Sequence, residues 1–400
     1  MKPIKKRIAH IASLFSFFLY TALCLSLYHT MSHMFFPHMS LIEWLYSSLW
    51  TKTPVIHSIG LRCLGSFLTS FFMVFLCTPR FFAFMKKKYL SGQPIRTFGP
   101  KTHIGKKEGT STMGGLLFIG AFCFSIFLWG HIKSPFVWIP SMALLGFGFL
   151  GFLDDIQKLQ KKNHHGVSAR GKLLLQIIIS AVCVIVFLYV MPYSEKASFF
   201  FPLQTKWVLP MGGVLYAFCM GAVFTGTVNA VNLTDGLDGL ASGCFLLTCG
   251  FLALIAYGTG DALYATSYHL LYIPHAQEIM VLCSALGGAV LGFLWFNTYP
   301  ALIFMGDTGS MALGGFLAAV SMLLKQELLL GFIGIIFVIE TLSVIIQVVI
   351  FRKTRKRIFL MTPIHHHFEE IGWSEPQIVT RFLIIQTIVG LCAILFFHLL

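Results

Sequence analysis

The feature of this sequence that most restricts its fold is a series of long apolar runs separated by short polar segments. Only 11% of the 400 residues are charged, whereas a soluble domain carries about 25%. A membrane-spanning helix needs about 20 mostly apolar residues, and runs of that kind recur along the whole chain. We therefore predict an all-α, polytopic integral membrane protein with eleven spans, at residues 11–36, 55–77, 113–130, 136–153, 172–190, 209–228, 240–257, 279–298, 309–324, 328–351 and 378–400.

The short connections between these runs leave no room for a separate soluble domain. Residues 51–400 hold ten of the predicted spans and form one integral-membrane domain. Residues 1–50 form an N-terminal extension that contains a basic start and a Phe-rich run. We interpret this run as an extra, uncleaved span, because it is long and lacks a clear small-residue cleavage site. A cleaved signal peptide is the alternative.

The positions of the basic residues predict the orientation of the chain. The formal net charge is +14, and 22 of the 29 Lys and Arg residues lie in four segments at 2–7, 80–107, 158–172 and 352–357. Eleven spans place all four segments on one side of the membrane, and the positive-inside rule makes that side the cytoplasm. This distribution indicates membrane topology rather than nucleic-acid binding.

A polar stretch, Asn229–Ala241, interrupts the apolar pattern with the sequence Asn-Ala-Val-Asn-Leu-Thr-Asp-Gly-Leu-Asp-Gly-Leu-Ala. Asn229 and Asn232 are three residues apart, as are Asp235 and Asp238, so each pair would share one face if the segment is helical. A polar turn between two helices is the alternative. The doubled Asp-Gly-Leu after a doubled Asn favours a binding site, because an apolar bundle does not compensate the desolvation of such groups.

Two further carboxylate motifs stand at the ends of predicted spans. Asp154 and Asp155 follow the span at 136–153, and adjacent carboxylates indicate a metal, a proton-transfer role or a nearby cation. Asp307 follows Gly306 just before the span at 309–324, where helix-start amides and a carboxylate could hold magnesium and a phosphate together. A simple N-cap is the alternative for Asp307.

Basic and histidine-rich segments complete the set of candidate groups. Lys106–Gly115 leads into a span and is compatible with phosphate binding or, equally, with a solvated basic loop. His365, His366 and His367 could form a zinc site, but imidazoles placed beside a diphosphate fit better, since adjacent side chains diverge on a helix. The predicted topology places these groups on the cytoplasmic side and predicts a polar cleft with cations for anions and carboxylates for a divalent metal.

Five of these motifs occur in an order that resembles the polyprenyl-phosphate N-acetylhexosamine-1-phosphate transferases, over roughly residues 51–400. The triple-histidine segment resembles the muramoyl-pentapeptide branch rather than the relatives that use UDP-N-acetylglucosamine. Ser111 and Thr362 depart from the usual Pro and Ala of the family. The resemblance rests on Thr112-Met-Gly-Gly, Asp154-Asp155, Asn229–Ala241, Phe304–Gly309 and Pro363-Ile-His-His-His-Phe368.

The resemblance implies ten core spans in a bacterial inner membrane, an active site facing the cytoplasm, often a homodimer, and a reaction that depends on Mg²⁺. The implied substrates are UDP-N-acetylmuramoyl-pentapeptide and undecaprenyl phosphate. The implied products are lipid I and UMP, in the first membrane step of peptidoglycan synthesis.

The resemblance also implies roles for individual residues. Asp307 would bind the metal, and Asp154 and Asp155 would activate the lipid phosphate, with His366 as a further catalytic group. Whether Asp154 acts as a base or as a covalent nucleophile stays open, although a base in a one-step attack is simpler. The residues implied to bind substrate are Lys107, Thr112, Lys158, Lys172, Asn229, Asn232, Asp235, Asp238, Asn297, Phe304, Gln347, His365 and His367.

Two other functions are compatible with a polytopic chain. The nearer one is a transferase that uses UDP-N-acetylglucosamine, which the triple histidine disfavours. The other is a transporter, which is disfavoured because the acidic residues cluster at one predicted face rather than in the middle of the membrane.

Overall fold

The computed structural model describes residues 58–88, 111–161, 166–191, 194–202, 207–268 and 270–399. These residues are mostly helical, with one short two-stranded sheet, which confirms the predicted all-α class. The predicted span at 11–36 and the rest of the N-terminal extension lie outside the described residues.

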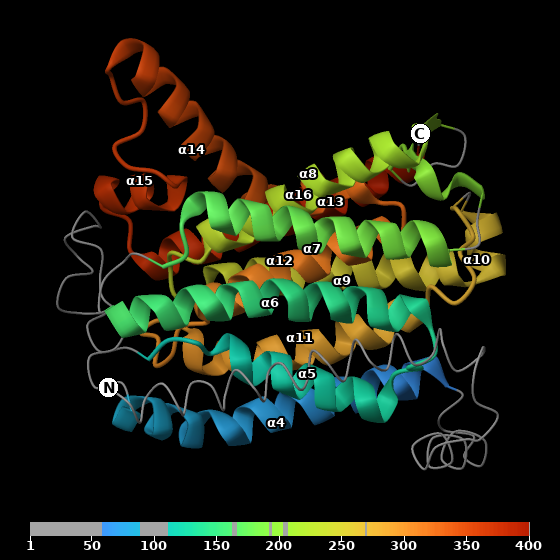
Figure 1. Cartoon of the computed structure of the whole chain (residues 1–400), viewed down its shortest axis with the longest axis horizontal. Coiled ribbons are helices and arrows are strands. Elements are labelled where there is room, and N and C mark those ends of the chain that lie inside the picture. The colour runs from blue at the N-terminus through green and yellow to red at the C-terminus, as the bar shows by residue number, and fades with distance from the viewer. Residues whose placement is uncertain are drawn as a thin grey trace.

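The described chain forms a bundle of long, roughly parallel and antiparallel helices (Figure 1). Eight of them are long and apolar enough to cross a membrane. The long helices are α4 (Ile59–Lys88), α5 (Gly115–Trp129), α6 (Pro135–Lys161), α7 (Ala169–Val190), α8 (Gly213–Thr234), α9 (Leu240–Gly260), α11 (Glu278–Asn297), α12 (Gly306–Leu323), α14 (Ile335–Thr354) and α16 (Glu375–Leu399). The shorter elements are η2 (Ser194–Ala197), β1 (Ser198–Phe200), β2 (Val208–Pro210), α10 (Ala262–Ser267), α13 (Glu327–Ile333) and α15 (Ile364–Ile371), where β1 and β2 pair antiparallel.

These helices correspond to the ten predicted core spans, but several differ in extent: α4 ends at Lys88 rather than at 77, and α8 ends at Thr234 rather than at 228. The helix α6 continues to Lys161, well beyond the predicted end at 153, because helical hydrogen bonding does not stop where the apolar run stops. The predicted span at 328–351 is divided at Gly334 into α13 and α14. Glycine has a low helix propensity, and a side chain here would approach the Leu330 carbonyl to 3.0 Å. The total of eleven spans stays a prediction.

The helix α12 forms the centre of the bundle. Every one of its residues except Asp307 is buried. Glycines allow its neighbours to approach closely: a Cβ at Gly315 would meet the Phe147 ring of α6 at 2.3 Å, and one at Gly314 would meet Val228 Cα of α8 at 2.6 Å. Small residues commonly bring membrane helices together in this way. The central helix therefore cannot shift without disturbing both neighbours.

The end of the bundle that carries α10 in Figure 1 is held by buried ion pairs. Arg62 of α4 forms two hydrogen bonds with Glu278 of α11, at 2.6 and 2.5 Å. Lys325, which is fully buried, donates to Glu327 at 3.2 Å and to the Tyr216 hydroxyl at 2.9 Å. Burial lowers the pKa of Lys325 and raises the pKa of Glu327, and the charge of each partner opposes the shift of the other. These contacts fix the bundle opposite the end described below.

Candidate active site

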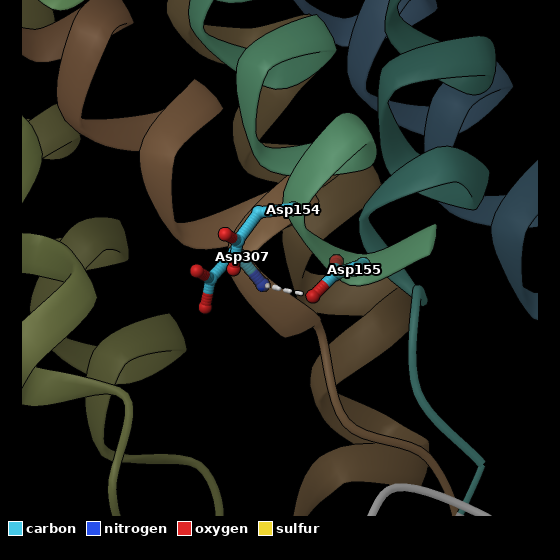
Figure 2. Close-up of side chains that lie close together, drawn as sticks. All are labelled: Asp154, Asp155 and Asp307. Atoms are coloured by element: carbon cyan, nitrogen blue, oxygen red, sulfur yellow. Dashed lines mark hydrogen bonds between the residues drawn. The ribbon is translucent and has the colours of Figure 1, made fainter. Parts of the chain in front are cut away.

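Three aspartates meet where the C-terminal part of α6 lies against the first turn of α12 (Figure 2). Asp154 and Asp155 come from α6, and Asp307 is the second residue of α12. One oxygen from each carboxylate lies within 4.8 Å of the others. Asp154 and Asp155 are buried, whereas the Asp307 side chain is 15% exposed. The two sequence motifs predicted to share one side of the bundle are thus adjacent.

Asp155 caps the start of α12 from a different helix. Its Oδ1 accepts from the Asp307 N–H at 3.1 Å, the bond drawn in Figure 2. Its Oδ2 accepts from the Thr308 N–H at 2.9 Å and from the Thr308 hydroxyl at 2.7 Å. These N–H groups have no partner within α12, and a carboxylate is favoured at a helix N-terminus. Both oxygens of Asp155 are therefore committed to holding α12 in place.

Glycines make room for this junction. Gly306 has φ +71°, and a Cβ there would lie 2.6 Å from Asp155 Oδ2 and 2.8 Å from Thr112 Oγ1. A Cβ at Gly151 would lie 2.1 Å from the Asp307 carbonyl oxygen. At position 306, only glycine accepts both the left-handed backbone and the close contact with Asp155. The Gly before Asp307 is thus explained by the packing of α12 against α6.

Two lysines neutralise the remaining carboxylates. Lys158 Nζ lies 2.7 Å from Asp154 Oδ2 and 3.1 Å from Asp307 Oδ2. Lys172, in the first turn of α7, lies 2.9 Å and 2.8 Å from the same two oxygens. Asp154 and Asp307 thus share two ammonium groups, which offsets the repulsion of two carboxylates in a partly buried place. Lys158 is 12% exposed and Lys172 is 24% exposed, so the cluster reaches solvent on this side.

The asparagine pair of the 229–241 motif is divided between two environments. Asn232, in the last turn of α8, donates to Asp307 Oδ1 at 3.1 Å and to the Ser310 hydroxyl at 2.8 Å. Asn229 instead exchanges hydrogen bonds with Gln176 of α7 at 3.0 and 3.2 Å. Only Asn232 joins the aspartate cluster.

The three histidines occupy the short helix α15, and each has a different neighbour. His365 is buried, with Nδ1 3.0 Å from Glu340 Oε2, and a Cβ at Gly236 would lie 2.2 Å from its Nε2. His366 Nδ1 pairs with Glu369 at 2.6 Å, and His367 Nδ1 accepts from the Leu360 N–H at 3.1 Å. The His365 and His366 ring centroids lie 4.1 Å apart, but the aspartate cluster is the only group of three or more acidic, His or Cys residues within the described ranges that is arranged to share an ion.

Comparison with known proteins places the cluster in a family. Residues 137–325 match the family described as Glycosyl transferase family 4. Proteins called phospho-N-acetylmuramoyl-pentapeptide-transferase in Ruegeria sp. (strain TM1040) and Rickettsia bellii (strain RML369-C) are each 44% identical, over 83% and 84% of this chain and 92% of each relative. The counterpart in Desulfotalea psychrophila is 45% identical over 85% of this chain and 94% of its own length. This chain belongs to the phospho-N-acetylmuramoyl-pentapeptide-transferase family.

Membership makes the chain a transferase and a multi-pass membrane protein, as the resemblance of its motifs predicted. The matched family segment at 137–325 contains all three aspartates and both lysines of the cluster, whereas α15 follows it. The part of the chain shared with the transferase family is therefore the part that holds the charged site.

The donor set of the cluster fits a divalent cation. Three carboxylates supply oxygen atoms, the ligands that Mg²⁺ prefers, within 4.8 Å of one another. Both oxygens of Asp155 already accept hydrogen bonds from the start of α12. Asp307 and Asp154 are therefore better placed to bind an ion. Lys158 and Lys172, which both pair with Asp154 and Asp307, are partly exposed, so their ammonium groups can also reach an anion that enters from solvent.

Several other residues implied to bind substrate in this transferase family serve the local backbone. Asp235 and Asp238 do not share a helical face, because the segment is not helical there: both lie in the turn between α8 and α9, where Gly239 has φ +80°. This is the polar turn considered as the alternative. Asp238 Oδ2 accepts from the Ala301 N–H at 2.9 Å. Asn297 is buried, accepts from the Gly239 N–H at 3.2 Å and donates to the Ile303 carbonyl at 3.0 Å. These groups hold the turn against the segment that leads into α12.

The backbone around Thr112 and Phe304 forms a second support for α12. The Phe304 N–H donates to the Ser111 carbonyl at 2.8 Å, and the Gly114 N–H donates to the Phe304 carbonyl at 2.9 Å. Thr112 is buried beside Gly306.

Gln347 accepts from the Ile358 and Phe359 N–H groups at 3.0 and 3.1 Å. Lys107, the remaining predicted residue, lies outside the described residues.

The structure adds three residues that the sequence reasoning did not single out. Thr308 binds Asp155 through its hydroxyl and its N–H. The Val167 N–H donates to Asp154 Oδ1 at 2.7 Å, and a Cβ at neighbouring Gly166 would lie 2.1 Å from the same oxygen. A hydroxyl directly after Asp307 at a helix start was a usable signal for Thr308. The contact from residues 166–167 depends on how the chain returns after α6 and has no local signal.

Proposed function

We propose that this protein transfers phospho-N-acetylmuramoyl-pentapeptide from UDP-N-acetylmuramoyl-pentapeptide to undecaprenyl phosphate. The products are lipid I and UMP. The observation that carries the proposal is the cluster of three aspartates and two lysines, which lies within the segment shared with the family. Both substrates carry phosphate charges, so their reaction requires a site that supplies cations to the phosphates and an acceptor for a proton.

The bond changes balance without an additional reactant. An oxygen of the lipid phosphate forms a bond to the β-phosphorus of the nucleotide donor. The bond between that phosphorus and the oxygen bridging to the α-phosphorus breaks, and UMP leaves with the bridging oxygen. A proton on the attacking phosphate passes to a carboxylate. We propose Asp154 for this step rather than Asp155, because Asp155 already accepts three hydrogen bonds from α12.

Lys158 and Lys172 are proposed to exchange partners during the reaction. Each now contacts Asp154 and Asp307 at 2.7–3.1 Å. A divalent cation on these carboxylates would repel the ammonium groups, which would then donate to the phosphate oxygens of the substrates. Asn232 keeps the Asp307 carboxylate oriented throughout, since it binds the oxygen that the lysines do not contact.

Mg²⁺ is the proposed metal, with Asp307 as its principal ligand. When bound, it would neutralise the diphosphate of the donor and the charge that develops on the departing UMP. Asp155 would contribute by keeping the first turn of α12, and with it Asp307, at the junction with α6.

The cytoplasmic face of the bacterial inner membrane is the proposed location of the site. The end of the bundle that carries the aspartate cluster also carries the C-terminal ends of α6 and α14, both of which are basic (Figure 1). The positive-inside rule supports a cytoplasmic position for such an end. A homodimer is a further proposal, which the mass of the protein in lipid nanodiscs would test. The histidines of α15 are proposed to contact the diphosphate or the sugar.

The proposal is tested by measuring UMP release from the purified protein with undecaprenyl phosphate, Mg²⁺ and either UDP-N-acetylmuramoyl-pentapeptide or UDP-N-acetylglucosamine. We expect release only with the muramoyl donor. Asp307→Asn should reduce the rate by a factor on the order of 10² to 10³, the usual cost of losing a group that stabilises charge in the transition state.

Asp261→Asn is the matched control. Asp261 caps α10 by accepting from the Leu263 and Tyr264 N–H groups at 2.9 and 3.1 Å, and asparagine caps a helix equally well. This variant should retain the full rate. Release with the N-acetylglucosamine donor would move the protein to the sister branch of transferases. No release with either donor, from a folded sample, would contradict the proposal.

A further inference from the structure

The C-terminal end of α14 and the residues directly after it carry a concentrated positive charge. Five basic residues lie within six positions: Arg352, Lys353, Arg355, Lys356 and Arg357. All five are exposed, and none forms an ion pair with another residue in the described part of the chain. The sequence has no acidic residue between Glu340 and Glu369. Residues 352–357, the end of α14 and the three residues after it, are called the basic tip below.

Apolar side chains surround the basic tip on both sides. On α14 itself, Ile345, Val349 and Phe351 are 51%, 45% and 39% exposed. Beyond the helix, Ile358 and Leu360 are 50% and 54% exposed. Exposed apolar residues on both sides of a positive cluster are typical of a segment that lies at a membrane surface, with its charges among the headgroups.

The position of α14 in the fold agrees with this placement. The helix leans away from the bundle, and its C-terminal end points toward the same end as the C-terminus of α6 (Figure 1). The basic tip is therefore displaced sideways from the other helices, at the end of the bundle that carries the aspartates. Since the bundle spans a membrane, a sideways displacement keeps the tip over lipid.

The basic tip has a defined structure rather than being a loose end. Gln347 accepts from the Ile358 and Phe359 N–H groups and donates to the Phe359 carbonyl at 3.2 Å. The Leu360 N–H donates to His367 Nδ1 at 3.1 Å. These bonds fold the chain back after α14, so that Ile358 and Leu360 stay next to the basic side chains.

We propose that the basic tip binds anionic phospholipid headgroups of the leaflet at the aspartate end of the bundle. A negatively charged surface attracts Lys and Arg that lie within about a Debye length of it, on the order of 8–10 Å. Five exposed positive charges flanked by exposed apolar side chains match a bilayer surface, which offers anions beside hydrocarbon. The proposal is independent of the reaction catalysed at the aspartate cluster.

Spin-labelled lipids test the proposal in the intact protein. The protein is reconstituted in phosphatidylcholine, and the motionally restricted fraction of spin-labelled phosphatidylglycerol is compared with that of spin-labelled phosphatidylcholine. We expect wild type to favour the anionic lipid, and a variant with R352Q, K353Q, R355Q, K356Q and R357Q to lose about half of that preference or more. The control with R352K, R355K and R357K keeps all five charges and should behave as wild type.

Two results would overturn the proposal. One is a glutamine variant that is folded by circular dichroism and retains the wild-type preference. The other is loss of the preference in inorganic phosphate but not in sodium chloride of equal ionic strength, which would indicate a site for free phosphate. Equal weakening by both salts would support an electrostatic contact with the bilayer surface.

Discussion

The contacts of Asp155 lead to a quantitative prediction for the Asp155→Asn variant. Oδ1 accepts from the Asp307 N–H, and Oδ2 accepts from both the N–H and the hydroxyl of Thr308. Asparagine has one acceptor oxygen and one NH₂ group. In this variant the NH₂ group must face a donor of α12, so at least one N–H at the start of α12 loses its partner.

The expected cost follows from the burial of this junction. A hydrogen bond to a charged group contributes about 1.5–3 kcal/mol, and a buried unpaired donor costs about 1–3 kcal/mol. We therefore expect Asp155→Asn to lower the free energy of unfolding by about 3 kcal/mol. Thr308→Val removes only the hydroxyl bond of 2.7 Å to the carboxylate and should cost about 1.5–3 kcal/mol, toward the lower end because Oδ2 keeps the Thr308 N–H.

The assay is reversible unfolding by sodium dodecyl sulfate in mixed micelles, applied to both single variants and to the double variant. Because Asp155 and Thr308 share a bond, their effects should not add, and a coupling energy of about 1 kcal/mol is expected. UMP release should also fall in Asp155→Asn, because Asp307 loses its support. An inactive Asp155→Asn protein with wild-type stability, or strictly additive losses, would refute the role of Asp155 as a cap.

Three further predictions concern other parts of the molecule. Lys325→Met leaves the Glu327 carboxylate buried without its cation and should lower the free energy of unfolding by about 3–5 kcal/mol in the same detergent titration; an unchanged midpoint would contradict this. Gly236→Ala places a Cβ 2.2 Å from His365 Nε2 and should slow UMP release on the order of tenfold to a hundredfold. Gly250→Ala has open space around its Cβ and should keep the wild-type rate. Equal rates for the two variants would show that the contact between Gly236 and His365 does not affect the reaction. Removal of divalent metal with EDTA should abolish UMP release and added Mg²⁺ should restore it, while persistence of the rate would argue against a metal in the aspartate cluster.

Most of the helical architecture could be predicted from the sequence. In hydrocarbon, each backbone N–H and C=O must find a partner within its own segment, so a sufficiently long apolar run becomes a helix whatever its neighbours are. This reasoning is weakest at boundaries, where polar residues follow the apolar run. The helix α6 therefore continues through Asp154 and Asp155 to Lys161, and the break at Gly334 depends on packing that the hydropathy pattern does not contain.

The candidate site was only partly predictable. Asp154, Asp155 and Asp307 stood out because charged groups at the ends of apolar spans need compensation, and the topology placed them on one side. The regular spacing of Asp235 and Asp238 was misleading, because the chain turns there instead of continuing as a helix. The pairing of Asn229 with Gln176 also depends on which helices are neighbours, which a single sequence does not reveal.

Asp154 and Asp155 illustrate the limit between the two kinds of information. The sequence by itself determined that a pair of carboxylates ends an apolar span and needs cations or a metal. Only the tertiary structure distinguished the two residues, because neighbours on a helix point about 100° apart. Asp155 faces the N–H groups at the start of α12, and Asp154 faces Lys158 and Lys172. Asp154 meets one lysine of its own helix and one of α7, whereas Asp155 meets the start of α12. The difference between the two carboxylates thus comes from α7 and α12, which are distant in the sequence.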